Sequence, residues 1–241
     1  MPSVPLAPPI RGVVFDFHHT LAHAGDPAVW LPREEQLREL LGAAFVRLEQ
    51  VTGGYAVTAT AGNGEDRRFV DIDAERAYAR AVDPDSERDL DPQRHREVFD
   101  RTIAQGSGID LELADALYSI MHRQWDVYDD VLPVLTALRD KGVRVAMLSN
   151  VGFDLTPTLE RTGVGALIDG AVMSYAVGVV KPDPGIFERA LEILDLPASD
   201  VLMVGDAWRD DGGAAALGVR TLILPRTDDP SHGLELVVRL V

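Results

Sequence analysis

Short apolar runs alternate with amphipathic segments along this chain, and the pattern is clearest in its second half. The first run, residues 12–17, contains Val13, Val14 and Phe15 and is typical of a parallel strand that is covered on both faces. The same character recurs in four later runs, which are residues 143–149, 170–174, 201–205 and 219–224. The pattern therefore predicts five buried strands.

Amphipathic helices are predicted between the later strands. Residues 129–142 begin with acidic side chains, carry apolar residues at helical spacing and end at a glycine, which is a common helix stop. Residues 184–194 repeat apolar side chains with the same period. Regular alternation of strands and helices predicts an α/β fold, a doubly wound parallel sheet with a Rossmann-like core.

More than a hundred residues separate the first predicted strand from the second, which is far longer than an ordinary crossover. We therefore predict that residues 1–22 and 129–241 form the core and that residues 23–128 form an inserted domain. The insertion is expected to be mainly α-helical, because residues 33–51 and 111–121 each place apolar side chains on one helical stripe. Residues 53–64 fit a loop or a small hairpin equally well.

Composition narrows the classes of partner. The 241 residues are 46% hydrophobic, and 39 Asp and Glu against 23 Lys and Arg give a net charge of −16. A surface this acidic repels nucleic acid and anionic membranes, so neither is an expected partner. An anionic substrate would have to meet a local cation.

Two further features bear on the compartment. The chain contains no cysteine, which excludes disulfide and thiolate chemistry and is compatible with a reducing cytoplasm. The first ten residues carry four prolines and no basic head, so they predict neither a signal peptide nor a membrane span. We expect a cytoplasmic protein that is a monomer or a homodimer.

Residues able to do chemistry follow the predicted strands. They lie in four motifs: FDFHHTL with Asp16, LSN with Ser149 and Asn150, VKPDP with Lys181, and VGDAWRDDGGAAALGV with Asp206, Asp210 and Asp211. Each motif alone has an ordinary explanation as a turn or a helix cap. All four together fall where parallel strands end, which is the edge at which open α/β sheets bind ligands.

These motifs, in this order, resemble those of the haloacid dehalogenase superfamily of hydrolases. The resemblance covers residues 10–22 and 129–225, and the insertion matches that family's cap domain in position and helical character. It implies a Mg²⁺-dependent phosphatase of a small phosphorylated metabolite, acting through an aspartyl-phosphate on Asp16. By the same resemblance Lys181 is catalytic and phosphate-binding, with Ser149 and Asn150 also on the phosphate.

The chemistry of these residue types also supports phosphoryl transfer without the resemblance. A carboxylate such as Asp16 can attack phosphorus and divide a difficult hydrolysis into two displacements. Carboxylates that converge at strand ends, Asp16 and Asp206 among them, would hold Mg²⁺, which prefers oxygen ligands. Lys181 adds a second positive charge beside the transferring group. The resemblance extends the predicted metal ligands to Asp16, the backbone carbonyl of His18, Asp206 and Asp211.

His18 departs from the family pattern, which usually has a second aspartate as acid and base at this position. Imidazole can also transfer protons near neutral pH, so His18 is a candidate catalytic residue. The substitution equally fits a weak or inactive binding protein, or, less favourably, a 2-haloacid dehalogenase. A second choice lies between Asp210 and Asp211 as the distal acid, and the spacing to the following Gly-Gly-Ala favours Asp211.

Overall fold

The structure is a computed structural model, and it describes residues 8–24, 45–51, 54–61, 64–70, 81–103, 114–115, 118–119, 121–123 and 125–241. The chain divides into two compact units. The first combines Met1–His23 with Asp126–Val241, and the second is Ala24–Trp125. We call them the core and the insertion.

The core is built on a five-stranded parallel sheet with the order β10-β9-β1-β7-β8. Its strands are β1 (Gly12–Asp16), β7 (Arg144–Ser149), β8 (Gly170–Met173), β9 (Val201–Gly205) and β10 (Arg220–Ile223). All five lie within the predicted apolar runs. The α/β fold with a parallel sheet is therefore confirmed, and the short strand boundaries differ from prediction by a residue or two.

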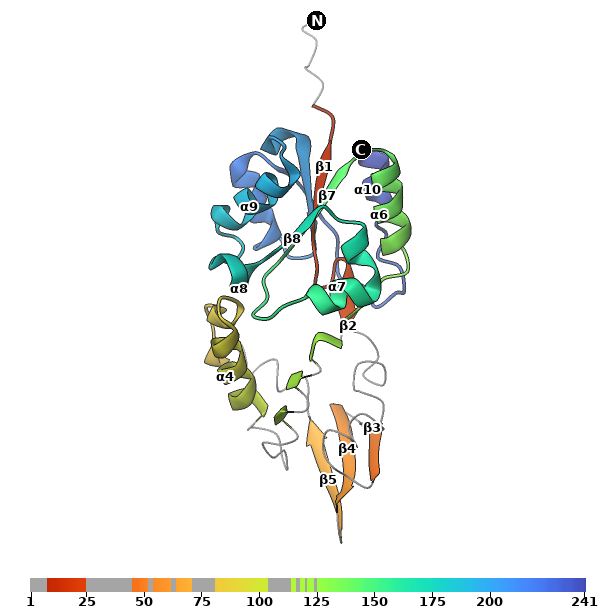
Figure 1. Cartoon of the computed structure of the whole chain (residues 1–241), viewed down its shortest axis with the longest axis vertical. Helices are drawn as coiled ribbons and strands as arrows, with labels where there is room; N and C mark the ends of the chain where they lie inside the picture. Colours follow the sequence, from red (N-terminus) through yellow and green to blue (C-terminus); the bar gives the residue numbers. More distant parts are fainter. Residues whose placement is uncertain are drawn as a thin grey trace, which may run out of the picture. The chain divides into compact units, whose positions relative to one another are not determined.

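Helices cover both faces of this sheet (Figure 1). On one face, α9 (Pro184–Leu194) packs Ile186, Phe187 and Ala190 against alternate strand residues such as Val14 and Leu148. The other face carries α6 (Val131–Asp140), next to α10 (Glu235–Leu240). Because side chains alternate along a strand, residues such as Val13 and Phe15 belong to this second face, and both are fully buried.

Shorter elements complete the core. These are β2 (Ala22–Ala24) and β6 (Trp125–Val127), which pair in a two-stranded sheet, the helices α7 (Thr156–Thr162) and α8 (Ser174–Val177), and the 3₁₀ turns η3 (Val164–Ala166), η4 (Ala198–Asp200) and η5 (Asp211–Leu217). The division between core and insertion falls within β2 and β6. Among the described residues, no helix is both long and apolar enough to cross a membrane.

The insertion contains strands as well as helices. Its described elements are β3 (Phe45–Val51), β4 (Gly54–Ala61), β5 (Gly64–Val70), η1 (Glu87–Asp89), α4 (Pro92–Ile103) and η2 (Met121–Arg123). The three strands form an antiparallel sheet in the order β3-β4-β5. The helix predicted through residues 33–51 is thus wrong for Phe45–Val51, and residues 33–44 of that prediction lie outside the described part.

Two other predictions for the insertion can be compared with the structure. Residues 53–64 fit a loop or a small hairpin, and the structure shows the hairpin, because β4 pairs antiparallel with β5 as well as with β3. Within the predicted helix at residues 111–121, the described residues 114–115 and 118–119 are helical. The predicted helical character of the insertion is therefore incomplete, because a three-stranded sheet is also present.

Candidate active site

Strand register brings the predicted motifs to one edge of the core sheet. Asp16, the last residue of β1, is level with Leu148 of β7, and Phe15 is level with Val204 of β9. Since all three strands are parallel, their carboxyl ends lie side by side. Ser149 and Asp206 therefore leave the sheet on either side of Asp16.

Lys181 joins two of the acidic side chains. Its Nζ donates a hydrogen bond to Oδ1 of Asp16 at 2.6 Å and another to Oδ1 of Asp211 at 2.7 Å. The exposed fractions of the three side chains are 4% for Lys181, 7% for Asp16 and 0% for Asp211. Buried charges are tolerated when they are paired and hydrogen-bonded, and this triad meets both conditions.

Asn150 holds the backbone of Lys181 in place. Its side-chain Oδ1 accepts a hydrogen bond from the Lys181 backbone N–H at 2.7 Å, and its Nδ2 donates to the Lys181 carbonyl at 3.1 Å. The end of β7 is thereby tied to the loop before α9, which carries the lysine. The phosphate contact predicted for Asn150 stays a prediction, and the contact seen here is a positioning one.

Two glycines allow close contacts of the acidic loop, Gly205 with Asp211 inside that loop and Gly213 with Pro182 of the lysine loop. A Cβ on Gly205 would lie 2.1 Å from Oδ2 of Asp211, and a Cβ on Gly213 would lie 2.7 Å from Cβ of Pro182. Any larger residue would push these segments apart. Oδ2 of Asp211 also accepts a hydrogen bond from the Ala207 backbone N–H at 2.9 Å, which fixes the carboxylate.

Asp206 completes the group from the end of β9. Its Oδ2 accepts a charge-assisted hydrogen bond from Nε of Arg226, which follows β10. The Asp206 side chain is 3% exposed, whereas the Arg226 side chain is 59% exposed. Sequence reasoning missed Arg226, although a basic residue just after the last strand of a very acidic chain was a signal that could have found it.

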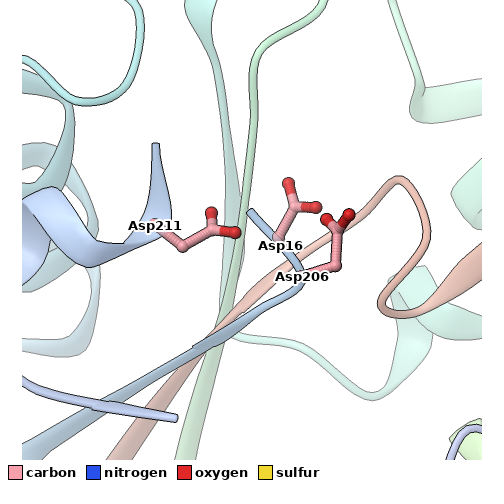
Figure 2. A group of neighbouring side chains, drawn as sticks. All are labelled: Asp16, Asp206 and Asp211. Atoms are coloured by element: carbon pink, nitrogen blue, oxygen red, sulfur yellow. The ribbon is translucent and has the colours of Figure 1, made fainter. Parts of the chain in front are cut away.

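The carboxylates of Asp16, Asp206 and Asp211 converge on one point (Figure 2). One oxygen of each lies within 4.8 Å of the others, which makes them the one group among the described residues able to share a metal ion. Three carboxylate oxygens in buried positions suit a hard divalent cation such as Mg²⁺, so the residues fit the predicted metal. Asp211 belongs to this group and Asp210 does not, in keeping with the spacing argument.

The environment shifts the protonation of this cluster. Burial raises the pKa of Asp16 from its ordinary 3.8 to about 7, although the charge of Lys181 opposes the shift. Burial alone would lower the pKa of Lys181, but the charges and hydrogen bonds of Asp16 and Asp211 outweigh it and raise that pKa above 10.5. Lys181 is accordingly a permanent cation at neutral pH.

His18 contacts the end of β7. Its Nδ1 is 3.2 Å from Oγ of Ser149, and which atom donates depends on the histidine tautomer. The His18 ring also meets the Phe17 ring edge to face, with 5.2 Å between centroids. Ser149 is fully buried, so the two side chains hold each other at the end of β7.

The fold thus gathers Asp16, His18, Ser149, Asn150, Lys181, Asp206 and Asp211 at one edge of the core. A family model for haloacid dehalogenase-like hydrolases matches residues 10–218, which is most of the chain. The chain belongs to this family.

Known relatives of this haloacid dehalogenase-like chain differ in name and in the share of the chain that they match. Haloacid dehalogenase-like hydrolase domain-containing protein 3 of Danio rerio is 33% identical over 113 residues, covering 46% of this chain and 47% of that protein. The phosphoglycolate phosphatase of Photobacterium profundum is 27% identical over 203 residues, covering 83% of this chain and 74% of that protein. The chain spans about half the length of the first curated relatives it matches.

Solved structures share the fold of this hydrolase family member. A dehalogenase crystallised with an intermediate complex superposes with a TM-score of 0.65 at 19% identity, covering 96% of this chain and 97% of that one. Identity this low supports the fold alone. The choice between phosphate and halide chemistry therefore rests on the site residues.

Proposed function

We propose that this chain is a Mg²⁺-dependent phosphatase of a small phosphorylated metabolite. The observation that carries the proposal is the buried group in which Asp16 and Asp211 share Lys181, with Asp206 beside them. Phosphoryl transfer needs a nucleophile, charge neutralisation and positioning, and this group supplies all three. The phosphatase relative that matches four fifths of the chain supports the same choice.

Asp16 is the nucleophile in this proposal. Lys181 occupies its Oδ1, so Oδ2 is the oxygen that we assign to attack on phosphorus. The bond from phosphorus to the ester oxygen breaks as the aspartyl-phosphate forms, and the departing oxygen takes a proton. Water then attacks the aspartyl-phosphate, gives up a proton, and releases inorganic phosphate with Asp16 restored.

The remaining residues position the phosphoryl group and neutralise its negative charge. Lys181 places a fixed positive charge beside the oxygens of the transferring group, and Asn150 holds the lysine backbone in place. Mg²⁺ held by Asp16, Asp206, Asp211 and the His18 carbonyl would neutralise phosphoryl charge. Ser149 is assigned to orient the phosphoryl group, and His18, which contacts Ser149, is assigned to carry the proton.

The decisive test is a phosphate-release assay over sugar, nucleotide and short-chain acid phosphates, with and without Mg²⁺. We expect at least one substrate to be turned over with Mg²⁺ and excess chelator to stop the reaction. Asp16→Asn should lower turnover by at least about a thousandfold while the protein stays folded. Well-folded wild-type protein that turns over nothing, with chelator making no difference, would refute the proposal.

A second candidate is a weakly active or inactive binding protein, and it is favoured by the histidine at position 18. Comparison of His18→Ala with His18→Asp separates the two possibilities. If His18 carries the proton, Ala should reduce turnover by about a hundredfold, within the usual range for acid–base catalysis. Wild-type activity no higher than that of Ala, with Asp restoring it, would show that the imidazole carries no proton.

Halide displacement from a 2-haloacid is the third possibility. In that reaction the Asp16 carboxylate would attack carbon and the halide would leave, with no need for the acidic group at Asp206 and Asp211. The assay is halide release from a 2-haloacid in excess chelator. Sustained release under those conditions would replace the phosphatase assignment.

A further inference from the structure

Each acidic side chain of the site has a cationic partner, but the two cations differ in how firmly they are held. Lys181 is buried and binds two carboxylates, with its backbone fixed by Asn150. Arg226 binds Asp206 alone through Nε, and more than half of its side chain faces solvent. In the part of the chain described here, Asp206 is the sole acidic group paired with Arg226.

This difference affects how easily each cation can be displaced. Withdrawing Lys181 would leave buried carboxylates unpaired, which is strongly unfavourable. Arg226 can swing into water, where its guanidinium is hydrated, and the buried Asp206 carboxylate that it leaves then needs another cation in its place. Lys181 is thus a permanent member of the cluster, and Arg226 is an exchangeable one.

The backbone of Asp206 is placed without Arg226. It follows directly from β9, a strand paired on both sides with β1 and β10. The backbone just before it is fixed by the hydrogen bond from Leu224 N–H to the Gly205 carbonyl, at 2.9 Å. The sheet therefore fixes the backbone of Asp206 at the cluster, and Arg226 contacts the carboxylate at the end of the side chain.

We propose that Arg226 competes with the divalent cation for Asp206 and so weakens metal binding at this site. The inference rests on the metal site of the proposed function. A divalent ion shared by Asp16, Asp206 and Asp211 needs an oxygen of Asp206, and a guanidinium on that carboxylate both occupies Oδ2 and repels a second positive charge.

The formal charges indicate the direction of the effect. Three carboxylates with Lys181 and Arg226 leave one net negative charge in the cluster, and loss of Arg226 leaves two. A divalent cation binds more tightly to the more negative cluster. Because Arg226 is exposed, water and salt screen its charge, so the expected change in affinity is about two- to tenfold.

The experiment measures binding of Mn²⁺ alone, as a stand-in for Mg²⁺, by the electron paramagnetic resonance signal of the free ion. It compares wild type, Arg226→Gln and Arg226→Lys at low ionic strength. We expect Gln to bind Mn²⁺ about two- to tenfold more tightly than wild type, and Lys to restore the wild-type affinity. The difference between Gln and wild type should shrink in about 0.5 M salt, where the Debye length is only a few ångströms.

Arg189→Gln is the matched control. Arg189 is also on the core, is 58% exposed and pairs with Glu192, but it has no contact with the acidic cluster. Its substitution should leave Mn²⁺ affinity unchanged. An equal gain in this control would trace the effect to net charge and would overturn the assignment to Arg226.

Unchanged or weaker Mn²⁺ binding by Arg226→Gln would also overturn the inference, since weaker binding would mean that the arginine orients Asp206. Absence of saturable binding in wild type and variant would remove both the inference and the metal site beneath it. Turnover is scored separately. Tighter Mn²⁺ binding without phosphatase activity would uphold the role of Arg226 and refute the proposed function.

Discussion

Pairs of basic and acidic side chains occur in both units of this protein, but the pairs of the acidic cluster in the core and the pairs of Arg96 in the insertion lie in opposite surroundings. In the core, the Lys181 side chain is 4% exposed and its partner Asp211 is 0% exposed. In the insertion, Arg96 is 30% exposed, and its partners Asp100 and Asp115 are 41% and 67% exposed. The same kind of contact is therefore buried at the acidic cluster of the core and exposed to solvent in the insertion.

This difference in burial decides how strongly each set of charges affects stability and protonation. Water screens the insertion pairs, so they contribute little to stability. Burial in the core raises the pKa of Asp16 and makes every neighbouring charge matter. Buried charges are costly to desolvate, and a fold that gathers several of them at a strand edge is typical of a functional site.

The largest expected effect on stability comes from the buried ion pairs of Lys181. Lys181→Met leaves the Asp16 and Asp211 carboxylates without their shared cation, and we expect the free energy of unfolding to fall by about 3–5 kcal/mol. Urea unfolding in the presence of chelator measures it. Lys141→Met is the control, because Lys141 is an exposed core lysine that only binds the carbonyls of Val238 and Val241.

The double variant Asp16→Asn with Lys181→Met sharpens this test. Removing one of the two unpaired charges should recover part of the lost stability, because the residues are in direct contact and their effects are not additive. A loss below about 1 kcal/mol in Lys181→Met would mean that burial does not set these pairs apart.

An intermediate effect is expected from a histidine of the insertion. Burial, together with the charge of Arg88, lowers the pKa of His95 from 6.5 to about 4. A group whose pKa is lower in the folded than in the unfolded state favours unfolding as the pH falls between those two values. From pH 7 to 5.5, wild type should lose about 1 kcal/mol of stability that His95→Gln retains.

Urea unfolding of both proteins at pH 7, 6.25 and 5.5 measures the difference, and this range stays above the sequence pI of about 4.7. His122→Gln offers a control in the same unit, since that histidine also lies in the insertion. Parallel pH profiles for wild type and His95→Gln would show that His95 is not held neutral.

The smallest effect is expected from the exposed pairs. Arg96→Met removes the ion pairs with Asp100 and Asp115 and the guanidinium that lies 4.6 Å from the Tyr118 ring centroid. Partial exposure keeps each contribution small, so we expect a total loss of no more than about 1 kcal/mol in urea unfolding. A loss as large as that of Lys181→Met would erase the contrast between the two units.

Sequence patterns located the core well because its strands are short continuous apolar runs and α9 keeps strict helical spacing. The insertion was harder. Phe45, Leu48 and Val51 recur every third residue, which looks helical, yet they lie in β3. Pairing decided the outcome, because β3 is matched along its whole length with β4, from Phe45 opposite Thr60 to Val51 opposite Gly54.

The sequence indicated which residues lie at the candidate site, but it did not indicate which of them contact one another. Motif order placed Asp16, Ser149, Lys181 and Asp206 at strand ends, and spacing favoured Asp211 over its neighbour. No pattern indicated that Asn150 would hold the Lys181 backbone. Nor did the sequence pair Arg226 with Asp206, because the two are neighbours only where β10 lies beside β9.

By itself, then, the sequence determined which chemical groups this protein carries and indicated that they follow parallel strands, since apolar periodicity and the order of the motifs along the chain can be read from the sequence alone. Tertiary structure alone decided which cation meets which acid. Lys181 and Asp16 are 165 residues apart in the chain and 2.6 Å apart in space. A hydrogen bond has to be correct to within a few tenths of an ångström, and only the packed register of the sheet and its loops sets distances that finely.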